Sequence, residues 1–279
     1  MVRPTEPRWM RAVLICCAAA FLTLVLLVPL AAVFVEALRK GAAVYWRNVS
    51  DAATIDALLL TLFTAAIAMP LNALFGVAAA WAVARFDFRG KNLLVTLIDL
   101  PFAVSPVISG LVFVLLLGSH TLVGGWLAEH GVRVIFAVPG VVLATLFVTF
   151  PYVARELIPL MQEQGSEDEQ AAVTLGANGW HTFRRVTLPR IRWALLYGLI
   201  LANARAIGEF GAVSVVSGHI RGSTNTLPLH VEILYNEYNS TGAFAVASLL
   251  TLFALATIAV KNILEWKMRR SRAAAEGRG

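Results

Sequence analysis

The sequence holds few residues of the types and spacing that catalysis needs. None of its five histidines stands in a His-Glu-x-x-His pattern, which would place two metal ligands on one helix face. Cys16 and Cys17 are adjacent, so on a helix they point in different directions and do not form a metal or disulfide pair. The G-x-x-x-x-G-K-[ST] loop that cradles nucleotide phosphates is also absent from the sequence. We therefore expect no catalytic residue, no metal and no cofactor, and any ATP hydrolysis must come from another chain.

Arg205 and Glu209 are ionisable residues inside a long apolar segment, where an unpaired charge costs about 2.5–3.5 kcal/mol. Four residues apart, they share a helix face and can form an ion pair. One interpretation is that Arg205 lends positive potential to an anion path. The other is a clamp between helices, in which Asp99 could also take part. The clamp is favoured, because an arginine neutralised by a carboxylate attracts an anion only weakly.

Two prolines interrupt another apolar segment. Pro101 and Pro106 remove two backbone donors within six residues, so we expect the helix to kink or break there. Broken backbone at membrane depth is tolerated only where it meets protein or water. Serine hydroxyls nearby could hydrogen-bond a passing oxyanion, or could equally serve as packing contacts between helices. The candidate residues of a translocation path are Pro101, Ser105, Pro106, Arg205, Glu209 and Ser214, with Ser109 and Ser217 as further hydroxyls.

The composition indicates that membrane-spanning helices position these residues. Only 14% of the 279 residues are charged and 58% are hydrophobic, whereas soluble domains carry about 25% charged residues. Residues 12–35 contain no ionisable side chain apart from the two cysteines, and residues 57–84 contain none. A membrane-spanning helix needs roughly 20 such residues. The first run exceeds the 7–15 residues, roughly, of a signal-peptide core, so we interpret it as a retained span.

Six apolar segments predict an all-α, polytopic membrane helical bundle with six transmembrane helices, at about 12–35, 58–84, 93–117, 134–154, 193–217 and 243–260. With the N-terminus inside, 17 of the 23 Lys and Arg residues fall in inner segments and 5 in outer loops. Both termini are therefore expected in the cytoplasm, as a short segment 1–11 and a basic tail 266–279 beside anionic membrane lipid. We expect that tail to be disordered. The basic pI follows from topology, and we expect no nucleic-acid partner.

The longest cytoplasmic loop is predicted at about 155–192, within a permease domain spanning 12–265. Its central part, the loop 165–190, begins with a predicted short helix. Ser166 and Glu169 have the spacing of a capping box, in which each side chain satisfies a free backbone N–H at the helix start. Gly176 suits the left-handed position that ends a helix.

A second short helix is predicted to follow, with Asn178 as its cap. Pro189 should end it, and Leu188 should be extended because it precedes a proline. The helix displays an apolar stripe at helical spacing, formed by Trp180, Phe183 and Val186. Such a stripe favours a protein partner, although it could also pack on this chain's own helix ends. A DNA-binding helix–turn–helix is disfavoured because both ends are tethered to the bilayer.

The same loop resembles the EAA motif of ABC-importer permeases. It reads Gln170-Ala171-Ala172, three residues, Gly176, nine residues, then Val186-Thr187-Leu188-Pro189. The departure is Gln170 where the motif has Glu, with Glu169 one position earlier, about 100° around the helix. The resemblance implies the type I ABC-importer permease fold and an ATPase-coupling role for Glu169, Gln170, Ala171, Ala172, Gly176, Trp180, Phe183, Leu188 and Pro189.

Further stretches resemble the sulfate and molybdate permease branch, and most of all the W-type subunits of sulfate/thiosulfate importers: 100–106, 184–189, 203–218 and 220–222. The resemblance implies a non-catalytic permease subunit of the bacterial cytoplasmic (inner) membrane. Its implied partners are a cytoplasmic ABC ATPase dimer, a second homologous permease in a heterodimer, and an external sulfate/thiosulfate-binding protein. A molybdate importer is one alternative. An ion-coupled secondary transporter is another, since such proteins also place broken helices at mid-membrane, although the two-helix loop has no evident use there.

Overall fold

The computed structural model describes residues 8–276, and every regular element within that range is helical. In chain order the elements are α1 (Arg8–Leu22), η1 (Thr23–Leu27), α2 (Val28–Leu38), α3 (Ala42–Val49), α4 (Ala52–Arg85), α5 (Lys91–Ala103), α6 (Pro106–Leu117), α7 (Leu122–Glu129), α8 (Val138–Glu163), α9 (Glu167–Thr174), α10 (Gly179–Thr182), η2 (Phe183–Thr187), α11 (Leu188–Ile207), α12 (Gly211–Ser217), α13 (Leu227–Asn236) and α14 (Ser240–Glu276). The elements η1 and η2 are single π-helical turns. The all-α prediction is confirmed.

The long helices agree with six membrane spans. Four are unbroken and apolar enough to cross a bilayer: Trp9–Leu38, Ala52–Arg85, Val138–Glu163 and Ser240–Trp266. Two bent pairs supply the others. Between α5 and α6 the chain bends by 111°, and between the helix Gly179–Ile207 and α12 it bends by 54°. The first bend confirms the break predicted from the prolines. The second was not expected.

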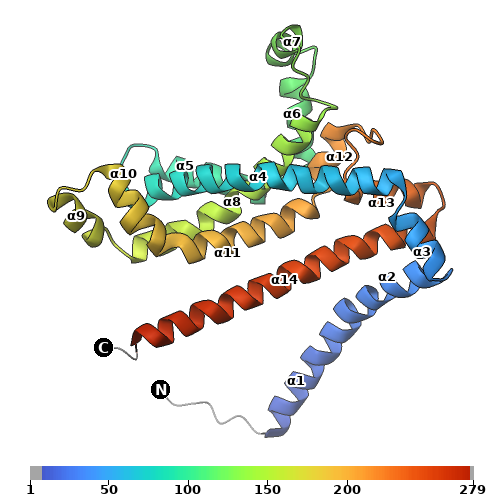
Figure 1. The fold of residues 1–279 in the computed structure, drawn as a ribbon, viewed down its shortest axis with the longest axis horizontal. Coiled ribbons are helices and arrows are strands. Elements are labelled where there is room, and N and C mark those ends of the chain that lie inside the picture. The colour runs from blue at the N-terminus through green and yellow to red at the C-terminus, as the bar shows by residue number, and fades with distance from the viewer. Residues whose placement is uncertain (1–7, 277–279) are drawn as a thin grey trace.

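The core of the bundle is formed by α4, α8 and α11, which run alongside one another (Figure 1). Small residues let them approach closely, as is common between helices in membranes. A Cβ atom added to Gly76 of α4 would lie 2.6 Å from Val153 Cγ1 of α8, and one added to Gly198 of α11 would lie 3.1 Å from Val153 Cα. These three helices therefore form a rigid unit about Val153.

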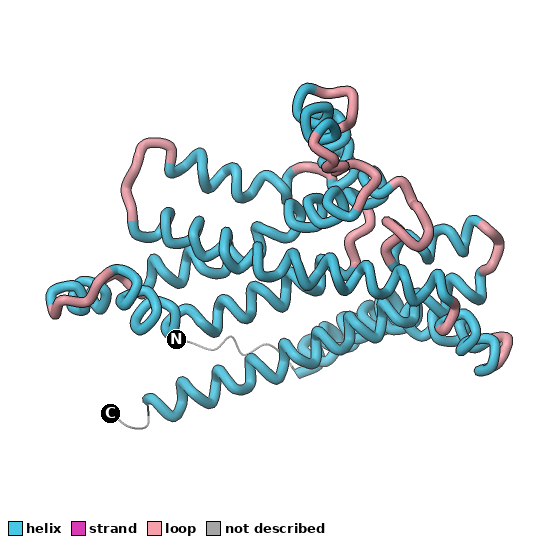
Figure 2. The backbone as a smooth tube through the Cα atoms, turned by 45° about the horizontal axis from the view of Figure 1, so that its top comes forward, coloured by secondary structure: helices cyan, strands magenta, loops and turns pink. Residues whose placement is uncertain are grey.

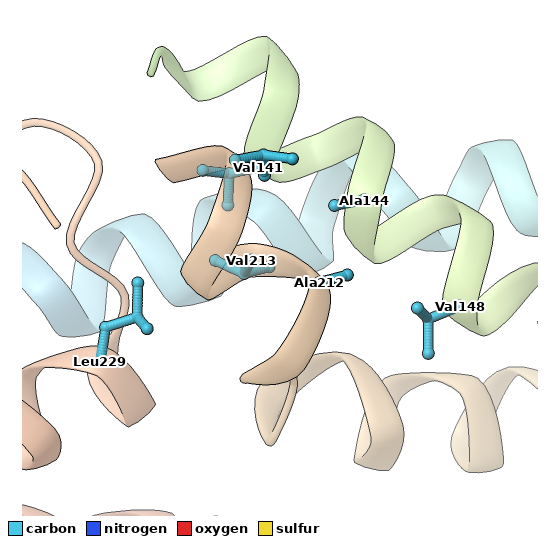
Figure 3. Close-up of a cluster of buried hydrophobic side chains, with 7 residues drawn as sticks. Val141, Ala144, Val148, Ala212, Val213 and Leu229 are labelled. Atoms are coloured by element: carbon cyan, nitrogen blue, oxygen red, sulfur yellow. The ribbon is translucent and has the colours of Figure 1, made fainter. Parts of the chain in front are cut away.

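A second buried cluster joins α8 to the short helix α12. Figure 3 shows the contributing side chains, Val141, Ala144 and Val148 from α8, Ala212 and Val213 from α12, and Leu229 from α13. This packing fixes α12 after the bend, so both limbs of the bent span are held against the same long helix.

The two ends of the bundle carry different elements (Figures 1 and 2). The short helices α9 and α10 lie at the end toward which α14 points, whereas α3 and α13 lie at the opposite end. Two segments project from the bundle: α6 with α7, and the arm formed by α1, η1 and α2. Helix α6 still contacts α12, and α2 contacts α14. None of the most apolar window of that arm is buried.

The prediction that Pro189 ends a separate short helix is wrong. Leu188 is helical, with φ −60° and ψ −43°, and Pro189 lies in the first turn of α11. The π-helical turn η2 explains the difference, because the N–H of Leu188 bonds to the carbonyl of Phe183, five residues earlier. Widening the turn accommodates the proline ring, which would otherwise meet a backbone carbonyl. The π-helical turn η1 likewise comes directly before a helix, α2, that has a proline, Pro29, in its first turn.

The two terminal segments also differ from expectation. Helix α1 already begins at Arg8, while the rest of the predicted segment, residues 1–7, lies outside the described residues. Helix α14 continues to Glu276, so the backbone of the basic tail is helical rather than disordered over that range. Its Ala-rich, proline-free composition favours continuation of the helix. Residues 277–279 lie outside the described residues.

Candidate coupling surface and translocation path

Glu169 is the best-connected side chain of the loop 165–190. Its carboxylate lies 2.8 Å from Nε of Arg85, the last residue of α4, and both side chains are nearly buried, at 13% and 9% exposure. The Thr187 hydroxyl donates a 2.7 Å hydrogen bond to the same carboxylate. Arg85 Nη1 in turn donates to the carbonyl of Met161 at 2.6 Å. Glu169 therefore connects α9 to α4, to the end of α8 and to η2.

The capping box predicted for Ser166 and Glu169 is wrong, because the carboxylate turns inward to Arg85. A charge-assisted pair is about twice as strong as a neutral hydrogen bond, which explains the choice. Gln170 faces outward, and its side-chain amide donates to the Ser166 hydroxyl at 2.8 Å. Ala171 is exposed and Ala172 is half-buried. At this motif position the structure thus offers an inward-facing charge at Glu169 and an uncharged outward-facing Gln170.

A second ion pair holds the start of α9. Asp168 contacts Arg190 of α11, and Arg190 Nη2 also donates to the carbonyl of Gln164 at 3.3 Å. The two ion pairs of α9 therefore link this helix to the membrane-spanning helices α4 and α11 rather than to its own backbone.

Gly176 has the left-handed conformation that its position predicts, with φ +89°. Its N–H bonds to the carbonyl of Val173, and the N–H of Ala177 bonds to that of Ala172. These are the two hydrogen bonds of a Schellman turn. No atom lies within 4 Å of a Cβ added at Gly176, so only its backbone conformation requires glycine.

The predicted cap of the second helix is confirmed: Asn178 Oδ1 accepts from the N–H of His181 at 2.8 Å. The two aromatic residues of the predicted stripe have different surroundings: one packs against this chain and the other faces solvent. Phe183 stacks on Trp81 of α4, with ring centroids 5.1 Å apart. Trp180 stacks on the outer side of Phe183 at 5.8 Å and remains 70% exposed. Val186 and Leu188 are half-buried, and Pro189 is exposed.

An exposed apolar surface remains on this end of the molecule, and we call it the α9–α10 patch. Its members are Val173 at 56% exposure, Leu175 at 89% and Trp180 at 70%. Exposed apolar residues gathered on a short polar-flanked element indicate a site for a protein partner.

The two broken spans meet through α6 and α12. Ser105 is the N-cap of α6 and Pro106 its first residue, while Pro101 is buried near the end of α5. Glycines allow the contact: a Cβ at Gly110 would lie 2.6 Å from the carbonyl oxygen of Ala212, and one at Gly211 would lie 2.9 Å from Pro106 Cβ. The structure therefore brings both breaks together.

Arg205 and Glu209 form the predicted ion pair, with Nη1 and Oε2 2.7 Å apart. They do so across the end of α11 rather than within one continuous helix. Glu209 is 2% exposed, and its Oε1 accepts the N–H of Ala212 at 2.9 Å, which satisfies a free donor at the start of α12. The pair thus acts as a clamp at the break.

Asp99 takes no part in that clamp. It pairs instead with Arg155 of α8, with Oδ1 and Nε 3.3 Å apart. The serine hydroxyls mostly serve their own helices: Ser109 donates to the carbonyl of Ser105, and Ser214 donates to that of Gly211. The side chain of Ser105, in contrast, lies on the exposed surface at the break.

His230 is a buried polar residue that sequence reasoning did not single out. It is 1% exposed on α13 and lies 3.2 Å from the Thr54 hydroxyl and 3.2 Å from the side-chain amide of Asn225. Burial, followed by the charge of Arg221, lowers the pKa of His230. The side chain therefore serves as a neutral hydrogen-bonding group between α4 and α13.

Arg85 and the Arg155–Asp99 pair were also missed as functional residues. Arg85 and Arg155 were counted only as topology signals. Neither lies within a recognisable motif, and both find their partners across helices far apart in sequence. Within the described residues, no group of three or more histidine, cysteine or carboxylate side chains is arranged to hold a metal ion.

Residues 72–270 match the family model described as "Binding-protein-dependent transport system inner membrane component". The chain is 53% identical over 252 residues to the sulfate transport system permease protein CysW of Escherichia coli, covering 90% of this chain and 87% of that protein. It is 34% identical over 250 residues to the sulfate transport system permease protein CysT of the same organism, covering 90% of each.

Among solved structures, the chain resembles a bacterial alginate ABC transporter in complex with an alginate pentasaccharide-bound periplasmic protein. The TM-score is 0.75 at 15% identity, over 94% of each chain. At that identity the likeness concerns the fold alone.

Proposed function

The chain belongs to the family of binding-protein-dependent transport system inner membrane components, and from that membership we propose that it is the permease subunit of an ATP-driven sulfate importer. It is a multi-pass protein of the cytoplasmic membrane. The relatives that share half or a third of its residues are sulfate permeases, and the match extends over nine-tenths of the chain. Neither relative supports the molybdate alternative, and an ion-coupled secondary carrier does not fit this family.

The observation that carries a coupling role is one uninterrupted helix. From Gly179 to Ile207 the chain is helical, through α10, η2 and α11. At 1.5 Å per residue this rod is about 43 Å long. It begins beside the exposed Trp180 and ends at the break next to Arg205 and Glu209. A force applied to the α9–α10 patch would therefore move the broken spans as a lever, because α10, η2 and α11 form one continuous helix.

The Arg85–Glu169–Thr187 network would make the lever part of a larger unit. Through it α9 is fastened to α4 as well as to the rod, so α9, α10 and the two long helices would move together. The Gly176 turn would set the angle at which α9 and α10 present the patch. On this proposal Glu169, rather than Gln170, supplies the charge that the EAA motif places in this loop.

The partners follow from the same proposal. An ABC ATPase dimer would seat the α9–α10 patch, and its closure on ATP would drive the lever. A CysT-like permease would form the other half of the pore, since both types of sulfate permease resemble this chain. An external sulfate-binding protein would deliver the anion. Both termini and the loop 165–190 would face the cytoplasm, as the distribution of Lys and Arg predicts.

The coupling role is tested by removing the exposed indole. Trp180→Ala should weaken co-purification of the ATPase with this chain by about tenfold or more, because exposed aromatics dominate interface energies. Trp46→Ala is the matched control: Trp46 is 65% exposed on α3, at the opposite end of the bundle, and its loss should leave ATPase binding unchanged. Equal ATPase binding by both variants would argue against the patch as the docking site.

A further inference from the structure

Arg155 is a charged residue on the membrane-spanning helix α8 rather than on the loop that follows it. It lies eight residues before the end of that helix at Glu163, about 12 Å inward along the axis. The sequence-based boundary near 154 had placed it at the start of the cytoplasmic loop. At this position on a spanning helix, a charged side chain can meet a solute that crosses the membrane.

The surroundings of Arg155 hold it in place without using all of its donors. Nε lies 3.3 Å from Asp99 Oδ1, and the guanidinium carbon lies 5.1 Å from the centre of the Phe102 ring. Phe102 is itself held edge-to-face against Tyr152 of α8. Among the described residues, the two terminal nitrogens, Nη1 and Nη2, have no protein acceptor. The Nε contact with Asp99 and the Phe102 ring therefore orient the guanidinium group, while its two terminal Nη groups remain free to bind a ligand.

Arg205 offers a useful contrast. Its partner Glu209 has a side chain that is 1% exposed, and the two charges are 2.7 Å apart. The side chains of Arg155 and Asp99 are 57% and 42% exposed and their contact is longer. Solvent screening makes such an open pair weak. Of the two arginines, Arg155 is the one whose positive charge remains available to a solute.

The exposed side of the pair must meet water or protein rather than lipid. A charge facing hydrocarbon costs about 2.5–3.5 kcal/mol. Asp99 and Phe102 share one face of α5, three residues apart, and that face leads to the break before Ser105. Broken backbone also requires a polar surrounding. The open pair and the break before Ser105 therefore both require a surrounding of water or protein on this side of α5 and α8.

We propose that this side of α5 and α8 lines a water-filled cavity, in which Arg155 is an anion-contact residue whose free Nη groups bind a tetrahedral oxyanion. The inference rests on the proposed sulfate-import function. A planar fork with two parallel donors matches two oxygens of such an anion. Asp99 is a positioning residue that competes with the anion for the guanidinium. Competition keeps binding weak enough for release, as conduction through a pore requires.

Thiol labelling tests whether the site faces water. In a Cys16→Ser, Cys17→Ser background, the Arg155→Cys variant of the importer, assembled with its ATPase and partner permease, should react with a membrane-impermeant thiol reagent. Leu157→Cys is the matched control, since Leu157 is fully buried two residues away and should not react. If the Arg155→Cys variant fails to react, or if both variants react equally, the cavity is overturned.

Uptake by proteoliposomes tests the anion contact. Arg155→Gln should lower the maximal rate of sulfate uptake by about tenfold or more, as expected for loss of a charged contact. Arg155→Lys, which keeps the charge but loses the two parallel Nη donors, should give a maximal uptake rate between those of the wild type and Arg155→Gln. Asp99→Asn also breaks the ion pair but should cost no more than about threefold, because the contact with the anion survives.

A purely structural clamp would give a different pattern. Arg155→Gln and Asp99→Asn would then reduce uptake equally, together with co-purification of the partner permease, and this result would overturn the proposal. If wild-type proteoliposomes take up no sulfate at all, the proposed function fails, and the labelling result still decides whether Arg155 faces water.

Discussion

Replacing Glu169 by glutamine probes the contact that fastens the loop 165–190 to the membrane-spanning helices. The change keeps the size of the side chain and removes its charge. Arg85 would keep its hydrogen bond to the carbonyl of Met161 but would lose the carboxylate 2.8 Å from its Nε. Thr187 would still find an amide oxygen to which it can donate. The perturbation therefore isolates the charge of one nearly buried pair.

The magnitude follows from the burial of both partners. Removing one member of a buried ion pair costs about 3–5 kcal/mol because the remaining charge is left unpaired. Here the carbonyl of Met161 and the new amide oxygen compensate in part, so we expect about 2–3 kcal/mol, at the level of a hydrogen bond to a charged group. At 1.36 kcal/mol per tenfold change, opening of α9 away from α4 becomes about 30- to 150-fold more frequent.

Hydrogen–deuterium exchange of the amides in 167–174 measures that opening directly. Glu169→Gln should accelerate exchange there by about 30- to 150-fold and lower ATP-dependent uptake, while membrane insertion stays intact. Gln170→Ala is the matched control, because its side chain is exposed and, among the described residues, hydrogen-bonds only to the Ser166 hydroxyl. It should change exchange by no more than about twofold. Exchange in Glu169→Gln that matches the Gln170→Ala control would refute the reasoning.

Three further predictions concern turns, packing and pH. Gly176→Ala should reduce ATP-dependent uptake, since the left-handed backbone conformation of Gly176 costs an alanine about 1–2 kcal/mol. Gly179→Ala is the control: Gly179 has no positive φ and an added Cβ would have no neighbour within 4 Å, so uptake should remain at the wild-type rate. Gly110→Ala should destabilise the detergent-purified protein by about 1–3 kcal/mol in thermal unfolding, because its Cβ would lie 2.6 Å from a carbonyl of α12; Gly208→Ala, with its nearest neighbour at 3.8 Å, should unfold within about 0.5 kcal/mol of wild type. The lowered pKa of His230 means that the unfolded chain takes up a proton at a higher pH than the folded one, so the free energy of unfolding should fall as pH drops below about 6.5. His230→Asn should flatten this dependence between pH 7.5 and 5.5, and an unchanged slope would show that another group is responsible.

Much of the fold could be read from hydropathy and charge. Runs of uncharged residues locate spans because every lipid-facing position must be apolar, and the broken third span was visible in the spacing of Pro101 and Pro106. Gly176 and Asn178 were predicted correctly since each acts on its own backbone. Features of this kind depend on residues that are close together in the sequence, so the sequence alone predicts them.

Features that depend on distant partners were not predictable. The capping box failed because Arg85, 84 residues away in sequence, offers Glu169 a stronger partner than its own helix end. The continuation of α10 through Pro189 depends on a π-helical turn, and a proline by itself predicts an end. The bend at Gly208 was missed because no proline marks it, and Glu209 caps the new helix only after the chain has turned.

The central claim is that a separate ATPase drives sulfate through this subunit by way of the α10–η2–α11 rod. It is tested most directly by labelled-sulfate uptake into proteoliposomes that contain this chain, its partner permease, the ATPase and the external binding protein. The account predicts uptake that requires ATP and all four components, and that is lost when the ATPase is omitted. Sulfate uptake that persists without ATP or without the ATPase, driven by a proton or sodium gradient, would contradict it.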